Sequence, residues 1–143
     1  MLLGRCDHPI ELVEALPVPV ILSGGLSDEA RVGCALSESG ADAVMLARGS
    51  LGNPWLFGRL LGTYEGEPSA NEVLAELDWI VSAAEDHLGV DRAGRYLRKF
   101  YPWYADRLGL TRRERHALVT VPTTAHARDV FAALVEPALP HAA

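Results

Sequence analysis

Two short apolar segments, each followed by a glycine turn, constrain the fold of this chain more than any other feature. Residues 18–22 lead into Ser23-Gly24-Gly25, and residues 41–47 lead into Arg48-Gly49. Short apolar runs of this kind are typical of strands that are covered on both faces. Residues 27–40 start with a capping serine and end at a glycine, which favours a helix. The sequence therefore predicts a βαβ unit with two parallel strands.

The length of the chain, 143 residues, limits which fold can contain this unit. A complete eight-stranded β/α barrel needs about 200 residues or more, so a barrel signal here comes from part of one. We expect residues 1–62 to form the C-terminal end of a TIM barrel, its last two βα units. The predicted fold class is α/β, with an all-α helical domain after the barrel part.

The helical domain, residues 63–143, is predicted after a turn-rich linker at residues 62–68. Ser69 and Glu72 match a capping box, and one face of the segment that follows stays apolar up to Gly89. These features predict a long amphipathic helix at the start of the domain.

Three more helices are expected in the second half of the chain. Residues 91–108 should form one helix with a kink at Pro102, because a proline inside a helix removes a backbone hydrogen bond. Residues 111–118 and 123–134 should form two shorter helices.

The charge of the chain is unevenly distributed. The whole chain has a formal net charge of -6, yet residues 92–115 carry eight basic side chains and two acidic ones. A local basic surface on an otherwise acidic protein suits an anionic partner, while an ordinary solvated helical face is the alternative.

The two glycine turns follow parallel strands, so they should meet at the same edge of the sheet. A backbone without Cβ lets an anion approach its N–H groups closely, and the loops after strands 7 and 8 of β/α barrels frequently bind phosphate. Simple turn formation is the alternative. The phosphate could belong to a substrate or to a cofactor such as FMN. The candidate residues are Ser23, Gly24, Gly25, Ala47, Arg48 and Gly49.

The sequence carries no pattern for a metal site, a disulfide framework or a membrane span. Cys6 and Cys34 lack CxxC spacing and clustered histidines, so we interpret them as small apolar residues of a cytoplasmic protein. No segment approaches the roughly 18 apolar residues of a membrane span, and we expect neither export nor insertion.

The tract ARGSLGNPWLF, residues 47–57, is the most specific motif of the chain. With the strands before it, it resembles the end of the barrel in the tRNA-dihydrouridine synthases, whereas generic phosphate-binding barrels lack its Gly-Asn-Pro-Trp. RYLRKFYPWYADRLGL, residues 95–110, is similar to the basic helix of that family, and residues 111–134 to its closing helices. The chain departs from the family pattern where Ser23-Gly24-Gly25 replaces Asn-Gly-Asp and where Ala47 replaces a glycine.

The resemblance implies an enzyme that reduces uridine to 5,6-dihydrouridine in tRNA with FMN, and with NADPH as reductant. The two glycine turns would hold the FMN phosphate. The helical domain would bind tRNA, mainly through contacts of arginine and lysine with phosphates. The RNA-binding residues expected on it are Arg92, Arg95, Arg98, Lys99, Arg112 and Arg113.

Aromatic residues are interleaved with these basic ones. Stacking on exposed bases is one use for them. The helical spacing of Tyr96, Phe100 and Trp103 instead favours burial in the core of the helical domain, and the same holds for Leu97 and Tyr104. We therefore expect the arginines, more than the rings, to contact RNA.

No catalytic residue is expected in this chain. By the resemblance, earlier strands of the family carry most flavin contacts, a lysine near the flavin ring and a cysteine that acts as general acid. Neither Cys6 nor Cys34 has that sequence context, and the single lysine, Lys99, lies in the helical domain.

We therefore interpret the chain as a fragment of a tRNA-dihydrouridine synthase that is inactive alone. Open strand edges predict self-association of such a fragment. Two alternatives remain: a fragment of another phosphate-binding TIM-barrel enzyme, and a stand-alone RNA-binding module.

Overall fold

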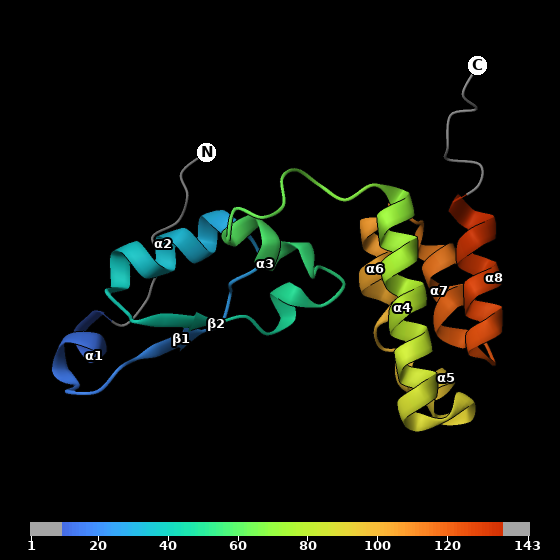
Figure 1. The fold of residues 1–143 in the computed structure, drawn as a ribbon, viewed down its shortest axis with the longest axis horizontal. Helices are drawn as coiled ribbons and strands as arrows, with labels where there is room; N and C mark the ends of the chain where they lie inside the picture. Colours follow the sequence, from blue (N-terminus) through green and yellow to red (C-terminus); the bar gives the residue numbers. More distant parts are fainter. Residues whose placement is uncertain (1–9, 136–143) are drawn as a thin grey trace, which may run out of the picture. The chain divides into compact units, whose positions relative to one another are not determined.

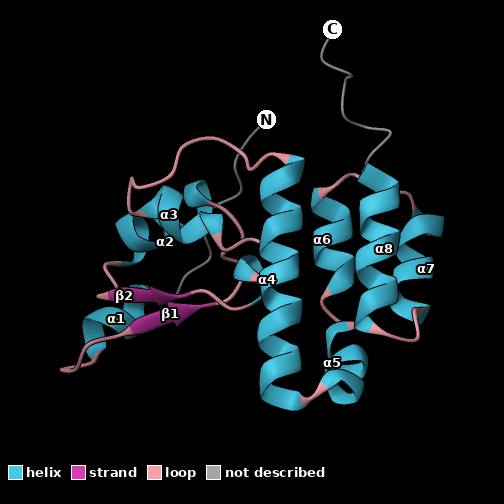
Figure 2. Cartoon of the chain, turned by 45° about the vertical axis from the view of Figure 1, so that its right-hand side comes forward, coloured by secondary structure: helices cyan, strands magenta, loops and turns pink. Residues whose placement is uncertain are grey.

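The structure, a computed structural model, describes residues 10–135 of the chain. These residues divide into two compact units, one ending at Gly66 and the other starting at Glu67 (Figure 1). Both strands belong to the first unit, and the second unit is entirely helical (Figure 2). Cys6 lies outside the described residues.

The first unit, called unit 1 below, is built around two parallel strands. β1 pairs with β2, and Leu22 lies opposite Val44 in the register. α2 connects the two strands, so the predicted βαβ unit is confirmed. The elements of unit 1 are α1 (Ile10–Ala15), β1 (Ile21–Ser23), α2 (Glu29–Ser39), β2 (Ala43–Met45), the 3-10 helix η1 (Arg48–Ser50) and α3 (Trp55–Leu60).

Both strands are shorter than the apolar runs that predicted them. Pro19 has no N–H group to donate to a ladder, and the N–H of Val20 donates to the Asp42 carboxylate at 2.8 Å instead. At the other end, the chain leaves β2 after Met45 and turns into η1. Regular pairing is thereby limited to three residues in each strand.

The helix between the strands begins one residue later than the predicted cap. Asp28 is the N-cap residue of α2, and its Oδ1 accepts a hydrogen bond of 2.9 Å from the N–H of Arg31. Ser27, the predicted cap, donates its hydroxyl to Asp28 at 3.0 Å. The predicted end is confirmed, because Gly40 takes the left-handed conformation with φ 70°.

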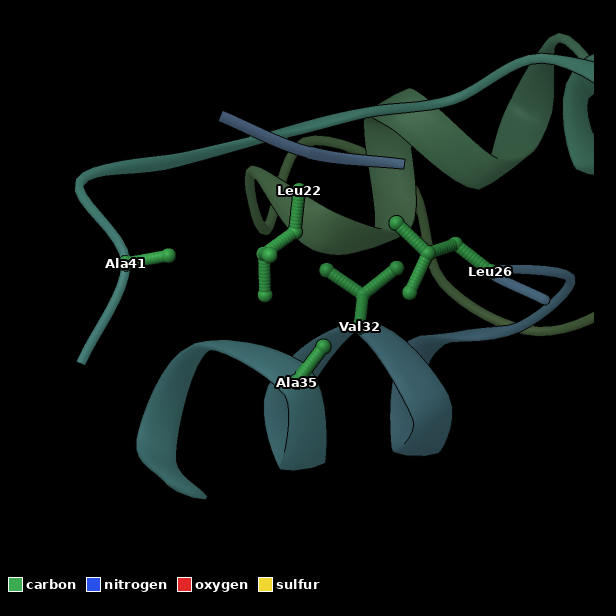
Figure 3. Close-up of a cluster of buried hydrophobic side chains, with 5 residues drawn as sticks. All are labelled: Leu22, Leu26, Val32, Ala35 and Ala41. Atoms are coloured by element: carbon green, nitrogen blue, oxygen red, sulfur yellow. The ribbon is translucent and has the colours of Figure 1, made fainter. Parts of the chain in front are cut away.

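The core of unit 1 lies on one side of the strand pair. Five buried residues form it, and Figure 3 shows them gathered over the inner face of α2. On the opposite side of the sheet, Ile21 is 64% exposed and Met45 is 56% exposed. One apolar face of the sheet is therefore left uncovered by residues 10–66. The five core residues are Leu22, Leu26, Val32, Ala35 and Ala41.

The second unit, unit 2, begins with the predicted long helix. Ser69 caps it, and the reciprocal contacts between Ser69 and Glu72 form the expected capping box. A second capping box joins Thr111 to Glu114. The helices of unit 2 are α4 (Ala70–Leu88), α5 (Val90–Leu97), α6 (Tyr101–Arg107), α7 (Arg112–Thr120) and α8 (Thr124–Val135).

The predicted kinked helix at residues 91–108 is wrong, because the structure has two separate helices there. α5 ends at Leu97, and α6 begins at Tyr101 with Pro102 in its first turn. In a first turn the missing N–H of proline costs no intrahelical hydrogen bond. α5 also starts at Val90 without a side-chain cap, and its N-cap residue is Gly89.

The core of unit 2 contains large side chains from every helix of the unit. Tyr101 of α6 meets Phe131 of α8 edge to face, with ring centroids 5.7 Å apart. Such aromatic pairs add stability beyond the area that they bury. The buried residues of the unit are Val73, Leu77, Val81, Ala93, Gly94, Leu97, Tyr101, Tyr104, Ala105, Leu118, Val121, Thr124, Ala127 and Phe131.

Candidate functional site

The two glycine turns of unit 1 lie against each other. An ideal Cβ on Gly49 would lie 2.0 Å from the carbonyl oxygen of Leu26 and 2.9 Å from the Cα of Ser27. Both of those residues follow the turn after β1, so only glycine at position 49 lets the turn after β2 approach so closely. Gly24 and Gly25 have φ values of 113° and 68°, which side-chain-bearing residues rarely adopt.

Backbone N–H groups at these turns are available to an anion. Within residues 10–135, the N–H groups of Gly24, Gly25, Arg48 and Gly49 donate none of the hydrogen bonds between residues. Ser23 and Arg48 are exposed. Free amides beside glycines form the kind of concavity that binds phosphate oxygens, and the Arg48 guanidinium adds a positive charge. The six candidate residues thus lie on two adjoining turns.

One residue near these turns was not suggested by the sequence. Arg31, in the first turn of α2, donates to the carbonyl of Gly25 at 3.3 Å and lies 3.5 Å from the Asp28 carboxylate. It therefore steadies the first glycine turn and adds a second guanidinium beside it. Sequence reasoning missed Arg31 because Asp28 and Glu29 mark the start of α2 as acidic.

Glu29 and Arg59 connect α2 to α3. Their side chains form a salt bridge, and Arg59 also donates to the carbonyl of Gly66 at 3.3 Å. A backbone hydrogen bond at the start of α2, together with Arg59, lowers the pKa of the Glu29 carboxyl. The ionised Glu29 carboxylate therefore helps to hold α2 against α3 in unit 1.

The basic residues of unit 2 fall into two groups. Four of them serve the fold. Arg98 donates to the carbonyl of Val121 at 3.1 Å, and Arg107 pairs with Glu67 at 2.8 Å. Arg115 pairs with Asp106, and Arg128 pairs with Asp78 at 2.6 Å and with Glu85 at 3.2 Å. The others are exposed and take part in no ion pair among the described residues. They are Arg92, Arg95, Lys99, Arg112 and Arg113.

The aromatic residues of this segment divide between core and surface. Tyr104 and Leu97 are buried as expected, but Tyr96 is 46% exposed and Trp103 is 37% exposed, so the prediction of burial is wrong for these two. The break between α5 and α6 changes which ring positions share a face. Burial raises the pKa of the Tyr101 hydroxyl to about 12 and also raises that of Tyr104.

Two further findings concern the part of the chain that the structure describes. It holds no group of three or more His, Cys, Asp or Glu side chains that could bind a metal ion. None of its helices is long and apolar enough to cross a membrane. Cys34 is half-buried, as expected of a small apolar residue, but it is disulfide-bonded, which the sequence did not indicate.

Comparison with known proteins gives one consistent result. Residues 8–136 match the family model described as dihydrouridine synthase. The tRNA-dihydrouridine synthase B of Pasteurella multocida is 34% identical over 103 residues, which cover 68% of this chain and 31% of that protein. A probable tRNA-dihydrouridine synthase of Mycobacterium leprae is 32% identical over 111 residues, 74% of this chain and 29% of the relative.

A third relative gives the same proportions. The probable tRNA-dihydrouridine synthase of Rickettsia conorii is 35% identical over 101 residues, 66% of this chain and 30% of that protein. The chain therefore spans about 30% of the length of the curated relatives that it matches.

Proposed function

The chain belongs to the dihydrouridine synthase family, and from that premise we propose that it is the C-terminal portion of a tRNA-dihydrouridine synthase. Such an enzyme reduces uridine to 5,6-dihydrouridine in tRNA, a substrate that would place it in the cytoplasm. One observation carries the proposal: the family match runs through both units, residues 8–136, although the chain spans about 30% of its relatives. In this proposal unit 1 is the end of a TIM barrel, and unit 2 binds tRNA.

The two glycine turns suit the phosphate end of an FMN site. Gly49 has no room for a Cβ, and the amides of Gly24 and Gly25 are free to donate. These turns and Arg48 would hold the phosphate, while Arg31 fixes the carbonyl of Gly25. When bound, FMN supplies the hydride that reduces the C5=C6 bond of uracil, and NADPH supplies the electrons that recharge it.

No described residue of this chain is assigned to proton transfer in the reaction. Cys34 lies in α2 and is disulfide-bonded, and Lys99 lies at the surface of unit 2. The general acid and most of the flavin contacts would come from barrel strands that this chain does not supply. We therefore expect the chain alone to be inactive.

The uncovered face of the sheet supports a proposal about association. Ile21 and Met45 expose apolar surface on the side of the strands away from α2. In a complete barrel, neighbouring strands and interior side chains would cover this face. In the chain alone, contact with a second copy would remove the same apolar surface from water, so we expect self-association.

One alternative retains support from a specific observation. Unit 2 has its own core of large side chains and exposes five basic residues, so a stand-alone RNA-binding module would need only this unit. A fragment of a different phosphate-binding barrel would not explain the family match.

A chimera tests the proposal directly. The segment of the Pasteurella multocida enzyme that matches this chain would be replaced by this chain, and dihydrouridine formed in an unmodified tRNA transcript would be measured with FMN and NADPH. We expect dihydrouridine from the chimera and none from the chain alone. The matched control is the chimera with Gly49→Ala, which should lose FMN because the added Cβ meets the carbonyl of Leu26. A chimera that folds and binds FMN but leaves uridine unreduced would contradict the proposal.

A further inference from the structure

A small aromatic and basic cluster lies at the end of α5. The ammonium group of Lys99 is 3.9 Å from the ring centroid of Tyr96 and 5.0 Å from that of Phe100. The two rings are tilted by 44° with centroids 5.3 Å apart. Tyr96 is 46% exposed, whereas Tyr101, five positions later, is fully buried. Tyr96 is thus a surface residue, and Phe100 beside it is half-buried.

The packing of α5 explains why this cluster faces solvent. The helix turns Ala93, Gly94 and Leu97 toward the core. A Cβ on Gly94 would lie 3.7 Å from the carbonyl of Pro122, in ordinary van der Waals contact, so the helix packs against the segment that connects α7 and α8. The opposite face then points outward, and an exposed ring is held there by a rigid helix.

Basic side chains share this outward face. Arg92, Arg95 and Tyr96 lie at spacings that place them on one side of α5. Lys99 follows in the turn after the helix, and all four side chains are exposed. Among the described residues, the side chains of Arg92 and Arg95 take part in no hydrogen bond or ion pair. The acid on the same helix, Asp91, leaves a net positive charge on this surface.

We propose that Tyr96, Lys99 and Phe100 form a stacking site for an unpaired nucleotide of the RNA, with Arg92 and Arg95 on the neighbouring phosphates. The inference rests on the proposed function, since tRNA is the ligand. An exposed ring offers area to a base that has left its helix, and the ammonium beside it reaches the phosphate of the same nucleotide. The basic side chains on this face form no ion pair with a carboxylate, and their positive charge favours binding of a polyanion.

Stacking and charge contribute to affinity in distinguishable ways. Loss of a phosphate contact lowers the slope of log affinity against log salt by about one. Loss of a stacked ring weakens binding at every salt concentration and leaves the slope unchanged. Stacking of one base on one aromatic side chain changes affinity by roughly 5- to 150-fold, and at an exposed site we expect the lower part of that range.

The experiment measures binding of the full chain to an unmodified tRNA transcript at several salt concentrations. Tyr96→Ala should bind at least about 5-fold more weakly with the same salt slope, and Tyr96→Phe should bind like the unchanged chain. Lys99→Ala should lower the slope by about one. The matched control is Trp79→Ala, because Trp79 is 66% exposed on α4 and has no basic residue within four positions, so its loss should change nothing.

The outcomes separate this inference from the proposed function. If the unchanged chain binds tRNA with a steep salt slope and Tyr96→Ala binds equally well, the stacking site is refuted while the tRNA-binding role stands. If the folded chain binds no tRNA at low salt, that role fails. The stacking site would also be overturned if a fully paired RNA duplex bound as tightly as tRNA. The same holds if polyglutamate displaced tRNA at an equal concentration of charges. Circular dichroism of each variant confirms that the helices are intact.

Discussion

Unit 1 and unit 2 differ in how completely they bury their apolar surface. In unit 1 a cluster of five small or medium side chains lies on one side of two short strands, and Ile21 and Met45 remain exposed on the other side. In unit 2 the rings of Tyr101, Tyr104 and Phe131 are buried among residues from all five helices. Burial of apolar surface is the main favourable term in folding, so unit 2 has much more of its own stability.

This difference follows from what each kind of element needs. A parallel strand pair needs cover on both faces and partners on both edges, and only a sheet or barrel with more strands supplies these. A helix satisfies its own backbone and needs one packed face, which four neighbouring helices can provide. The helices of unit 2 therefore meet these needs among themselves, whereas the strand pair of unit 1 does not.

The largest expected effect concerns amide hydrogen exchange in the intact chain. Amides of β1 and α2 should exchange quickly through local opening, whereas those of α4, α6 and α8 should exchange only when unit 2 unfolds. Mass spectrometry of peptides from each unit measures this contrast. In the chimera the added barrel strands should slow exchange in β1 and α2 and leave α4 unchanged. Equal protection in the two units of the chain alone would refute the comparison.

The sequence allowed some elements to be predicted because their signals are local. The contacts between Ser69 and Glu72 involve neighbouring residues, and Gly40 ends α2 wherever that helix packs. The parallel pairing followed from the order of two apolar runs. The break before Tyr101 could not be inferred, since Pro102 is compatible both with a kink and with the first turn of a new helix.

The candidate sites show the same limit. The glycine turns were visible in the sequence, but the approach of Gly49 to the carbonyl of Leu26 depends on how two loops pack. The hydrogen bond from Arg31 to the carbonyl of Gly25 depends on the same packing. The exposure of Tyr96 depends on which face of α5 meets the rest of unit 2, and helical spacing alone does not select that face.

A pair of glycine substitutions sharpens the contrast within unit 1. Gly49→Ala forces its Cβ onto the backbone of Leu26, so we expect it to destabilise unit 1 by about 1–3 kcal/mol. The matched control is Gly33→Ala in α2, where a Cβ meets no atom within 4 Å and should stabilise the helix by up to about 1 kcal/mol. Hydrogen exchange of α2 in the chimera measures both. If both substitutions stabilise the protein, or if both destabilise it, the close packing of the two glycine turns is contradicted.

A smaller effect is expected from pH, and it should appear in unit 2. Burial raises the pKa of Tyr101 from 10.0 to about 12, so the neutral hydroxyl is favoured in the folded state. Ionisation of the buried hydroxyl opposes folding, so the free energy of unfolding is constant below pH 10 and falls as pH rises toward 12, by about 2–3 kcal/mol. Chemical denaturation followed by circular dichroism at each pH measures the change.

Tyr101→Phe provides the control for this pH effect. The Tyr101 hydroxyl is buried without a hydrogen-bond partner among the described residues, so its removal should not cost stability at neutral pH. The variant should lose part of the alkaline decrease, and the remainder should come from Tyr104, whose pKa is also raised. An alkaline decrease that is identical in the variant would contradict this assignment.

Flavin absorbance of the purified chain tests the central claim most directly. If unit 1 provides only the phosphate end of an FMN site, the chain mixed with FMN and then desalted should be colourless, while the chimera treated in the same way should stay yellow. Both samples must contain the helices of unit 2, as measured by circular dichroism. Stoichiometric FMN retained by the chain alone would show that unit 1 holds a complete flavin site, and would contradict the account.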